Sequence, residues 1–435
     1  MLIAALAAMV ALTIWGLAFT KPLPETEVFP PAQSRSPYVP TLPTVRVGEK
    51  PYGLPGDPSP IGQGGQSELW FNDGTWWGVL LDAGSQTFRI HQLDWMSLGW
   101  IDSGTVVHKR SSARSDALWD ANKLYVVSAG EKARASNGVV LSRFSYYAST
   151  RRYARDANFP VTLTESGVRS LSLARDSSGK VWIAYIDQDL LVVRHSVQSD
   201  LVWTDALAPA APEMSGQVDV AVITQVGTAT VLVWTEATTD WVHVGVHRDA
   251  EPDDAWTVTS VEVPGLSLGP DDLAVTAADV GQAPRIYAAL RTSLDALPGH
   301  DRMAPQIVLM QAVLGGEPTV HLVSRVQDGQ TEPIVLLSSE PRSLYVASIS
   351  RNSNSPGIFL TQSGLDSIAF PGGSGLLLMA GEGATGVGAL SSSKQPISNQ
   401  TGIVLLTVDT GRGIYRYVAL DLGPGSTPRP PHSAD

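Results

Sequence analysis

The chain has 435 residues, of which 43% are apolar and 17% are charged, and its formal net charge is −12 at pH 7. The acidic balance argues against nucleic acid as a partner, because nucleic-acid sites concentrate Lys and Arg. The chain has no cysteine, which excludes disulfides, thiolate metal sites and a cysteine nucleophile.

The chain begins with an apolar run, Leu2–Thr20, of nineteen residues without a charged side chain. At about 1.5 Å per residue, a helix of this length crosses a hydrocarbon core of roughly 30 Å. No basic side chain precedes the run, and Ala18-Phe19-Thr20 is a poor cleavage site. Residues 1–20 are therefore predicted to form a retained transmembrane anchor, and a cleaved signal peptide is the alternative. A buried core helix is a further alternative. We expect the rest of the chain outside the cytoplasm, at the cell envelope if the run is retained and secreted if it is cleaved, and the charges near the run specify its orientation only weakly.

The next segment, residues 21–60, contains eleven prolines. Proline removes amide donors and favours the extended polyproline II conformation, so this segment is predicted to be a stiff linker. One piece of it, LPTVRV at residues 42–47, has the composition of a short strand.

Residues 61–422 consist of repeats of one unit, which is clearest at Val168–Val197. Three short strands with alternating or β-branched residues are separated there by the turns DSSG and DQD, and a fourth strand follows. The second strand of the unit returns seven times, at Trp76–Asp82, Lys123–Gly130, Lys180–Asp187, Thr230–Ala237, Arg285–Thr292, Ser343–Ser350 and Gly402–Asp409. Four antiparallel strands in about fifty residues is the unit of a β-propeller blade. The predicted fold is all-β, a single propeller of about seven four-stranded blades.

The last repeat supplies only three strands before a Pro/Gly tail, residues 423–435, which is predicted to be disordered. Residues 42–47 are the candidate for the missing outer strand, and pairing there would close the ring and remove an exposed sheet edge. The alternative is that residues 42–47 are only linker.

Two turns, Asn72-Asp73-Gly74-Thr75-Trp76 and Asp176–Trp182, come close to an Asp box. On these turns residues 66–422 resemble the sialidase-type (Asp-box, BNR-like) repeat propellers, with incomplete motifs. The resemblance implies the propeller fold. Sialidase chemistry would further need an arginine triad and a tyrosine nucleophile, but only Arg169 stands at the start of an innermost strand. No residue is therefore assigned a catalytic role.

The starts of the innermost strands bring a set of mostly acidic residues to the channel mouth where propellers usually bind ligands. The repeat register places there Glu68, Asp116, Arg169, Asp219, Asp272, Glu332 and Thr385. Carboxylate oxygens suit a hard cation, so Ca²⁺ at Asp116, Asp219 and Asp272 is the candidate metal site. The alternative is that these acids are solvated turn residues.

Three loops between second and third strands are expected at the same mouth. They supply the candidate rim residues Lys132, Arg134, His300, Asp301, Arg302 and Arg351. Loops on a rigid scaffold commonly carry function, although exposure alone also explains polar loops.

Two classes of function follow from these features. The first is a membrane-tethered, non-catalytic propeller that binds a protein or glycan partner through its top face. The alternative is an exported hydrolase, glycosidase-like or calcium-dependent and lactonase-like, that uses carboxylates at the channel mouth. The incomplete motifs and the long rim loops favour the binding scaffold.

Overall fold

The computed structural model describes residues 44–422, apart from 63–64, 110–112, 131–137, 208, 210–216, 267–271, 281–282, 351–355 and 382–385. The chain divides into two compact units, Met1–Leu42 and Pro43–Asp435, and the fold below is that of the second. The predicted anchor at 1–20, most of the proline-rich linker and the tail at 423–435 lie outside the described residues. No helix within the described part of the chain is long and apolar enough to cross a membrane.

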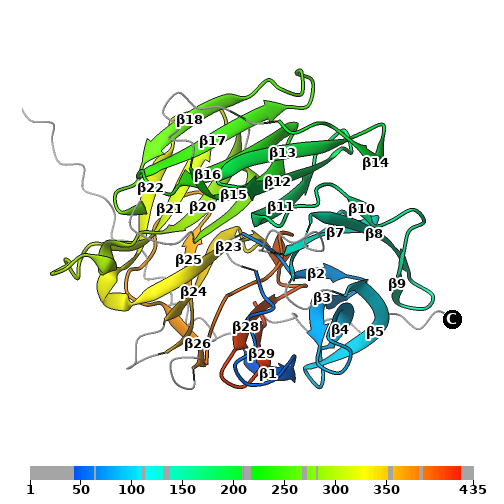
Figure 1. Cartoon of the computed structure of the whole chain (residues 1–435). Helices are drawn as coiled ribbons and strands as arrows, with labels where there is room; N and C mark the ends of the chain where they lie inside the picture. The colour runs from blue at the N-terminus through cyan, green and yellow to red at the C-terminus, as the bar shows by residue number, and fades with distance from the viewer. Residues whose placement is uncertain are drawn as a thin grey trace, which may run out of the picture. The chain divides into compact units, whose positions relative to one another are not determined.

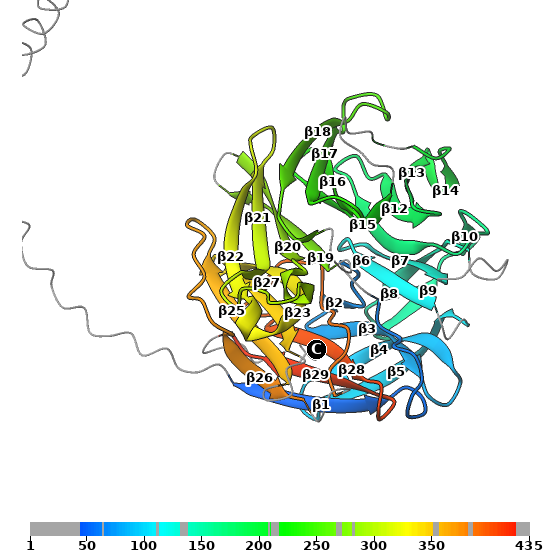
Figure 2. The same ribbon diagram turned by 60° about the vertical axis from the view of Figure 1, so that its left-hand side comes forward.

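The described residues form seven sheets arranged around a common axis, one per predicted repeat, and nearly all of their strand pairs are antiparallel (Figures 1 and 2). The fold is a seven-bladed β-propeller. In the first three sheets the strands run outward from the axis in chain order, except that the last two strands of blade 2 both pair with its third strand. Blade 1 contains β2 (Leu69–Asn72), β3 (Thr75–Asp82), β4 (Thr87–Asp94) and β5 (Gly99–His108); blade 2 contains β6 (Ala113–Trp119), β7 (Lys123–Gly130), β8 (Val140–Tyr147), β9 (Arg152–Arg155) and β10 (Val161–Thr162); blade 3 contains β11 (Arg169–Arg175), β12 (Val181–Asp187), β13 (Leu190–Val197) and β14 (Ser199–Trp203).

The next three blades continue the same order, and blade 6 gains a parallel strand from further along the chain. Blade 4 contains β15 (Val218–Val226), β16 (Ala229–Glu236), β17 (Trp241–Arg248) and β18 (Thr257–Glu262); blade 5 contains β19 (Leu273–Val280), β20 (Ala283–Arg291), β21 (Pro305–Val313) and β22 (Thr319–Arg325); blade 6 contains β23 (Gln330–Glu340), β24 (Ser343–Ser350), β25 (Gly357–Gly364), β26 (Leu376–Ala380) and the parallel β27 (Ile397–Ser398). The helical turns among the described residues are 3-10, η2 (Leu294–Ala296) and η3 (Val326–Asp328).

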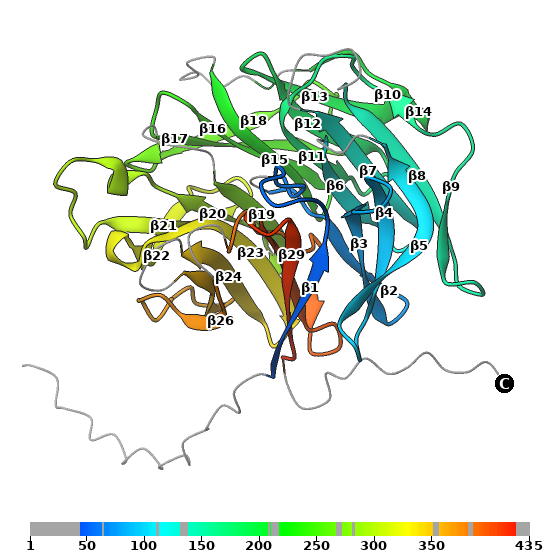
Figure 3. The same ribbon diagram turned by 60° about the horizontal axis from the view of Figure 1, so that its bottom comes forward.

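Blade 7 is assembled from both ends of the propeller. Its sheet contains β28 (Ile403–Asp409), β29 (Ile414–Leu420) and, as the outer strand, β1 (Val45–Pro51). β1 pairs antiparallel with β29 along its whole length, from Val45 opposite Leu420 to Pro51 opposite Ile414 (Figure 3). The closing strand is thus longer than the expected 42–47 and begins three residues later, because it continues through GEKP.

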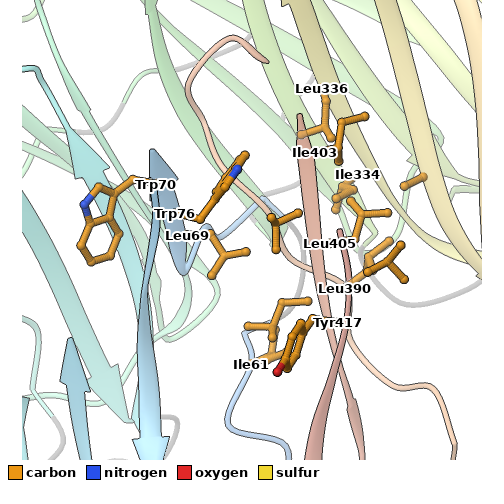
Figure 4. Packing of buried hydrophobic residues seen from close by; sticks show 14 of the residues in the cluster. Ile61, Leu69, Trp70, Trp76, Ile334, Leu336, Leu390, Ile403, Leu405 and Tyr417 are labelled. Atoms are coloured by element: carbon orange, nitrogen blue, oxygen red, sulfur yellow. The ribbon is translucent and has the colours of Figure 1, made fainter. Parts of the chain in front are cut away.

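The predicted repeat register is confirmed, since every second strand lies within two residues of its expected bounds. These strands are buried on both faces, and β16 and β24 are buried at every position. Burial on both faces explains their continuous apolar sequences, because neighbouring blades pack against each side. Side chains from blades 1, 6 and 7, including Trp76, Leu336 and Leu405, form one continuous core between those blades (Figure 4).

The Asp176 turn between β11 and β12 is held by its own carboxylate. One oxygen of Asp176 accepts hydrogen bonds from the Lys180 amide, at 2.9 Å, and the Ser178 hydroxyl, at 2.7 Å. The other accepts from the Trp182 indole nitrogen at 2.8 Å, so the turn is fastened to the buried Trp182. Asp176 therefore has a structural role, satisfying the polar groups of a tight turn.

Candidate functional site

The innermost strands line a central channel with two ends. The first mouth is the end where these strands begin, and the second mouth is the end where they stop and turn into the second strand. At the second mouth lies a cavity of about 540 Å³, here called the channel pocket. Its walls are the last residues of β6, β11, β15, β19 and β23 and the turns that follow, and residues 394–396 complete it. Five blades thus contribute to one pocket.

Lys394 forms the inner wall of the channel pocket. It belongs to the segment that leaves blade 7 at Ser391, which bridges to Leu406, and reaches the edge of blade 6 at β27. Its ammonium group donates to the carboxylate of Asp116, to the Ser172 hydroxyl at 3.1 Å and to the Leu173 carbonyl at 2.9 Å. An ammonium group has three donors, so all of them are used by the protein itself.

Asp116 is fully buried and joins three parts of the channel. Besides Lys394, its carboxylate accepts the Ser67 amide at 2.9 Å and the Leu173 amide at 2.7 Å. Burial raises the pKa of Asp116, and the charge of Lys394 and the two amide donors oppose that shift. The arrangement links the lead-in to β2 and the strand β11 on either side of β6.

Glu68 is also buried, and within the described residues no cation pairs with its carboxylate. One carboxylate oxygen accepts the Gly62 amide at 3.1 Å, while Oε2 has no hydrogen-bond partner among the described residues. Burial raises the pKa of Glu68 to about 7, and the nearby Asp116 adds to the shift. Glu68 therefore exchanges a proton near neutral pH, but it does not line the channel pocket.

Ion pairs and polar groups surround the opening of the channel pocket. Arg175 pairs with Asp120 at 2.8 Å, and Arg342 pairs with Asp366 at 3.1 Å with both side chains at least half exposed. Gln225 and Asp279 lie one residue before the ends of the inner strands β15 and β19, and the Gln225 side-chain amide donates to the Gly227 carbonyl. On the blade 6 side, the Ser338 hydroxyl is buried and has no partner within the described part of the chain. The pocket opening is thus polar, and the half-exposed Arg342 keeps donors for a ligand.

The predicted ring of carboxylates does not converge on one opening. Glu68 and Asp116 are buried within the channel, because β6 begins at Ala113 and Asp116 is its fourth residue. The other four members lie close to the first mouth and bind one another across blades. Arg169 pairs with Asp189 at 2.6 Å and approaches Asp219 at 3.7 Å, and the Asp272 carboxylate accepts the Glu332 amide at 3.0 Å. Thr385 lies outside the described residues.

The predicted calcium site is not supported by this arrangement. No three His, Asp or Glu side chains in the described residues gather closely enough to hold a metal ion, so Asp116, Asp219 and Asp272 do not form a shared site. The physical reason is that Asp116 is saturated by Lys394 and two amides, while Asp272 binds the neighbouring inner strand.

The predicted rim residues divide into two groups. Lys132, Arg134 and Arg351 fall in stretches that the structure does not describe. His300, Asp301 and Arg302 are exposed on the loop between β20 and β21, where Asp301 accepts the Met303 amide at 2.8 Å. That loop connects the second and third strands, so antiparallel alternation places it at the end of the blade opposite the channel pocket.

Sequence reasoning missed the channel pocket because it looked for the site at the first mouth. The pocket residues Gln225, Asp279 and Arg342 belong to the sequence segments TQVGTAT, ADVGQAP and SSEPRS, which stand where two of the other blades have a turn close to an Asp box. The sequence did contain a signal: these three segments lack the Asp-box pattern of those blades. A segment that departs from the structural pattern of its repeat is a candidate for a functional role.

Comparisons with known proteins show the fold and no family. No family model and no curated protein matches the chain. Among solved structures, the polysaccharide lyase Uly1 is 9% identical over 86% of this chain and 92% of its own, with a TM-score of 0.50. A mutant of AofleA from Arthrobotrys oligospora is 7% identical over 88% and 94%, with a TM-score of 0.47. The periplasmic gluconolactonase of Pseudomonas aeruginosa is 12% identical over 68% and 93%, with a TM-score of 0.40.

Proposed function

We propose that this protein is a membrane-tethered, extracytoplasmic propeller that binds a polar ligand, a glycan or a polar loop of a partner protein, without catalysing a reaction. The observation that carries the proposal is the channel pocket, to which five blades contribute polar side chains. Its volume of about 540 Å³ falls in the range of about 300–1,000 Å³ typical of ligand sites.

The state of the carboxylates favours binding over hydrolysis. The glycosidase-like hydrolase that the sequence suggests needs two carboxyl groups flanking its substrate. Asp116 is enclosed by Lys394 and two backbone amides, and Asp120 at the pocket is paired with Arg175. Of the acids that line the pocket in the described residues, this leaves Asp279, a single carboxylate, which can contact a ligand together with Gln225 and Arg342.

An exported hydrolase is the second candidate, and one observation favours it. The pKa of Glu68 is about 7, which suits a general acid or base at neutral pH. Conversion of neutral glycosides or lactones by the full chain, lost in Glu68→Gln, would support this candidate. Activity that persists in Glu68→Gln, or is absent in the wild type, would remove Glu68 from consideration.

The tether follows from the sequence of residues 1–60. An apolar run of nineteen residues and a proline-rich spacer together suit a domain held at a distance from a membrane. Extraction of membranes with alkaline carbonate tests it: the full chain stays in the pellet, and a variant without Leu2–Thr20 does not. Release of the full chain into the supernatant would contradict the tether.

Binding is tested by the melting temperature of the full chain in detergent with a panel of neutral mono- and disaccharides. A ligand that binds only the folded state raises the melting temperature by mass action. We expect at least one sugar to do so, and we expect Gln225→Ala combined with Arg342→Ala to abolish the shift. The control Arg302→Ala changes an exposed residue at the other end of its blade and should leave the shift intact. A shift that survives the double substitution would place the site elsewhere, and no shift with any sugar would argue against a glycan.

A further inference from the structure

A second concave surface follows the boundary between blades 1 and 2, away from the channel. There the outer strand β5 packs against β9 (Figures 1 and 2). Two cavities of about 400 and 710 Å³ lie along this boundary, lined on one side by successive residues of β5. Arg155 lines the first cavity and donates to the carbonyls of Val106 and Val107 at 2.8 and 2.5 Å. We call the two cavities together the seam groove.

The length of the seam groove suits an extended ligand. Its lining runs along β5 from Ser103 to His108 and continues to the next residue, Lys109. At about 3.3 Å per residue, that stretch of strand measures roughly 20 Å. A chain of several linked units can lie along it, whereas a single small molecule would occupy only one of the cavities.

The charge of the seam groove is opposite to that of the protein. The chain carries a net charge of −12, and many of its Lys and Arg side chains are bound to acids of the same chain, as Arg143 is to Asp156 and Asp200. Lys109 and Arg152 are exposed in the groove, and neither has an ion-pair partner within the described residues. Glu165 is the acidic residue among those that line it. Two unpaired cations along one groove of an acidic protein favour an anionic ligand.

The second cavity adds features that suit a sugar. Tyr147 lines it with 54% of its surface exposed, so its ring is available for stacking. The hydroxyl-bearing residues Ser103, Thr105 and Thr150 line the same cavity. An aromatic ring with hydroxyl groups and a guanidinium around it offers both the apolar face and the hydrogen bonds that a sugar ring requires.

The edge of β5 disfavours a peptide as the occupant. An extended peptide gains most of its affinity by adding a strand to a free sheet edge. Arg155 already occupies the carbonyls of Val106 and Val107, and the Thr105 hydroxyl donates to the Tyr153 carbonyl at 2.5 Å across the seam. The backbone of β5 is therefore engaged with blade 2 at the middle of the groove.

We propose that the seam groove binds an acidic oligosaccharide, a chain of uronic acid units whose carboxylates pair with Lys109 and Arg152 while one ring stacks on Tyr147. This site is separate from the channel pocket, and the proposal does not depend on whether a ligand binds in that pocket. It gives the propeller a side-facing site for an anionic polysaccharide.

The test uses the full chain in detergent and a fluorescently labelled tetragalacturonate, followed by anisotropy. We expect binding that weakens as NaCl rises from about 0.05 to about 0.5 M, because exposed charges are screened. Lys109→Gln combined with Arg152→Gln should weaken binding by about tenfold or more, and Tyr147→Ala by about tenfold, since charge-assisted hydrogen bonds and ring contacts are each lost. Arg302→Gln, which also removes one exposed positive charge, is the matched control and should leave binding unchanged.

Four results would overturn the proposal. They are no binding of tetragalacturonate, binding of a neutral galactose tetramer that is equally tight and equally weakened by the groove substitutions, a loss in Arg302→Gln as large as in the groove variants, and equally tight binding of a glutamate peptide at the same residues. Gln225→Ala combined with Arg342→Ala separates the two sites, because it should abolish sugar binding in the channel pocket and leave tetragalacturonate binding intact.

Discussion

The Lys394–Asp116 pair inside the channel and the Arg342–Asp366 pair at the opening of the channel pocket join the same kinds of groups in different surroundings. The side chains of Lys394 and Asp116 are 16% and 0% exposed, whereas those of Arg342 and Asp366 are 50% and 74% exposed. Inside, every donor of the cation has a protein acceptor. At the opening, water solvates both partners, and the cation keeps donors for a ligand.

The comparison teaches that burial, and not the identity of the residues, decides which charges hold the propeller together. A buried charge that loses its partner cannot be solvated by water, so removal of the partner strongly lowers the free energy of unfolding. An exposed charge that loses its partner is solvated by water and costs little. Charges inside the channel should therefore control stability, and charges at the opening should control binding.

The largest expected effect is that of Lys394→Met, which leaves Asp116 buried without its cation. We expect the free energy of unfolding to fall by about 3–5 kcal/mol, as is typical when one partner of a buried pair is removed. Urea unfolding followed by tryptophan fluorescence measures it. The matched control, Arg342→Met, should lose less than about 1 kcal/mol, and equal losses in the two variants would break the comparison.

The next effect is the pH dependence due to Glu68, whose pKa rises from 4.5 to about 7 on folding. Below about pH 4.5 both states carry the proton, between 4.5 and 7 only the native state keeps it, and above 7 neither does. The free energy of unfolding should therefore fall as pH rises through this window, by up to about 3 kcal/mol, and stay lower above it.

Glu68→Gln isolates this contribution, because the amide side chain does not ionise. The difference in unfolding free energy between the variant and the wild type should move in favour of the variant as pH rises from about 4.5 to about 7. Urea unfolding at several pH values measures it. A difference that stays constant across the window would show that Glu68 is not protonated in the native state.

A smaller effect is expected from two serines that fasten β11 to β15. The Ser170 hydroxyl accepts the Ala221 amide at 3.1 Å, and the Ser172 hydroxyl accepts the Ile223 amide at 3.2 Å. Each change to Ala leaves an amide unsatisfied and should lower the free energy of unfolding by about 1–3 kcal/mol. Ser172→Ala should cost more, because it also removes an acceptor of Lys394. Equal or reversed losses in urea unfolding would show that this contact with Lys394 contributes nothing.

The smallest effect concerns the exposed pair itself. A double-mutant cycle on Arg342→Ala and Asp366→Ala should give a coupling energy of about 0.2–1 kcal/mol. The coupling should shrink in about 1 M NaCl, where exposed charges are screened. Unfolding of the four proteins at low and high salt measures it. A coupling above about 2 kcal/mol, or one insensitive to salt, would mean that the pair is effectively buried.

The local pattern of the chain determined the blades. β-branched and aromatic runs such as Lys180–Asp187 form strands because they can be buried on both faces, and turns such as Asp176–Gly179 fix where one strand ends and the next begins. The last repeat lacks one strand, so the sequence also predicted that residues near 42–47 would supply it. The structure has the strand β1 there. These features depend on neighbours in sequence or on a periodic repeat, so the sequence alone reveals them.

The tertiary structure decided which mouth of the channel holds the described pocket and which charges are buried. Lys394 lies in a short stretch without a strand pattern, and its partners Asp116 and Ser172 are more than two hundred residues away. Asp116 was expected at an open mouth, but a strand that begins three residues before it carries it into the channel. Such contacts arise only when the ring closes, because closure brings inner strands from distant blades around one axis, and no local preference of the chain encodes that proximity.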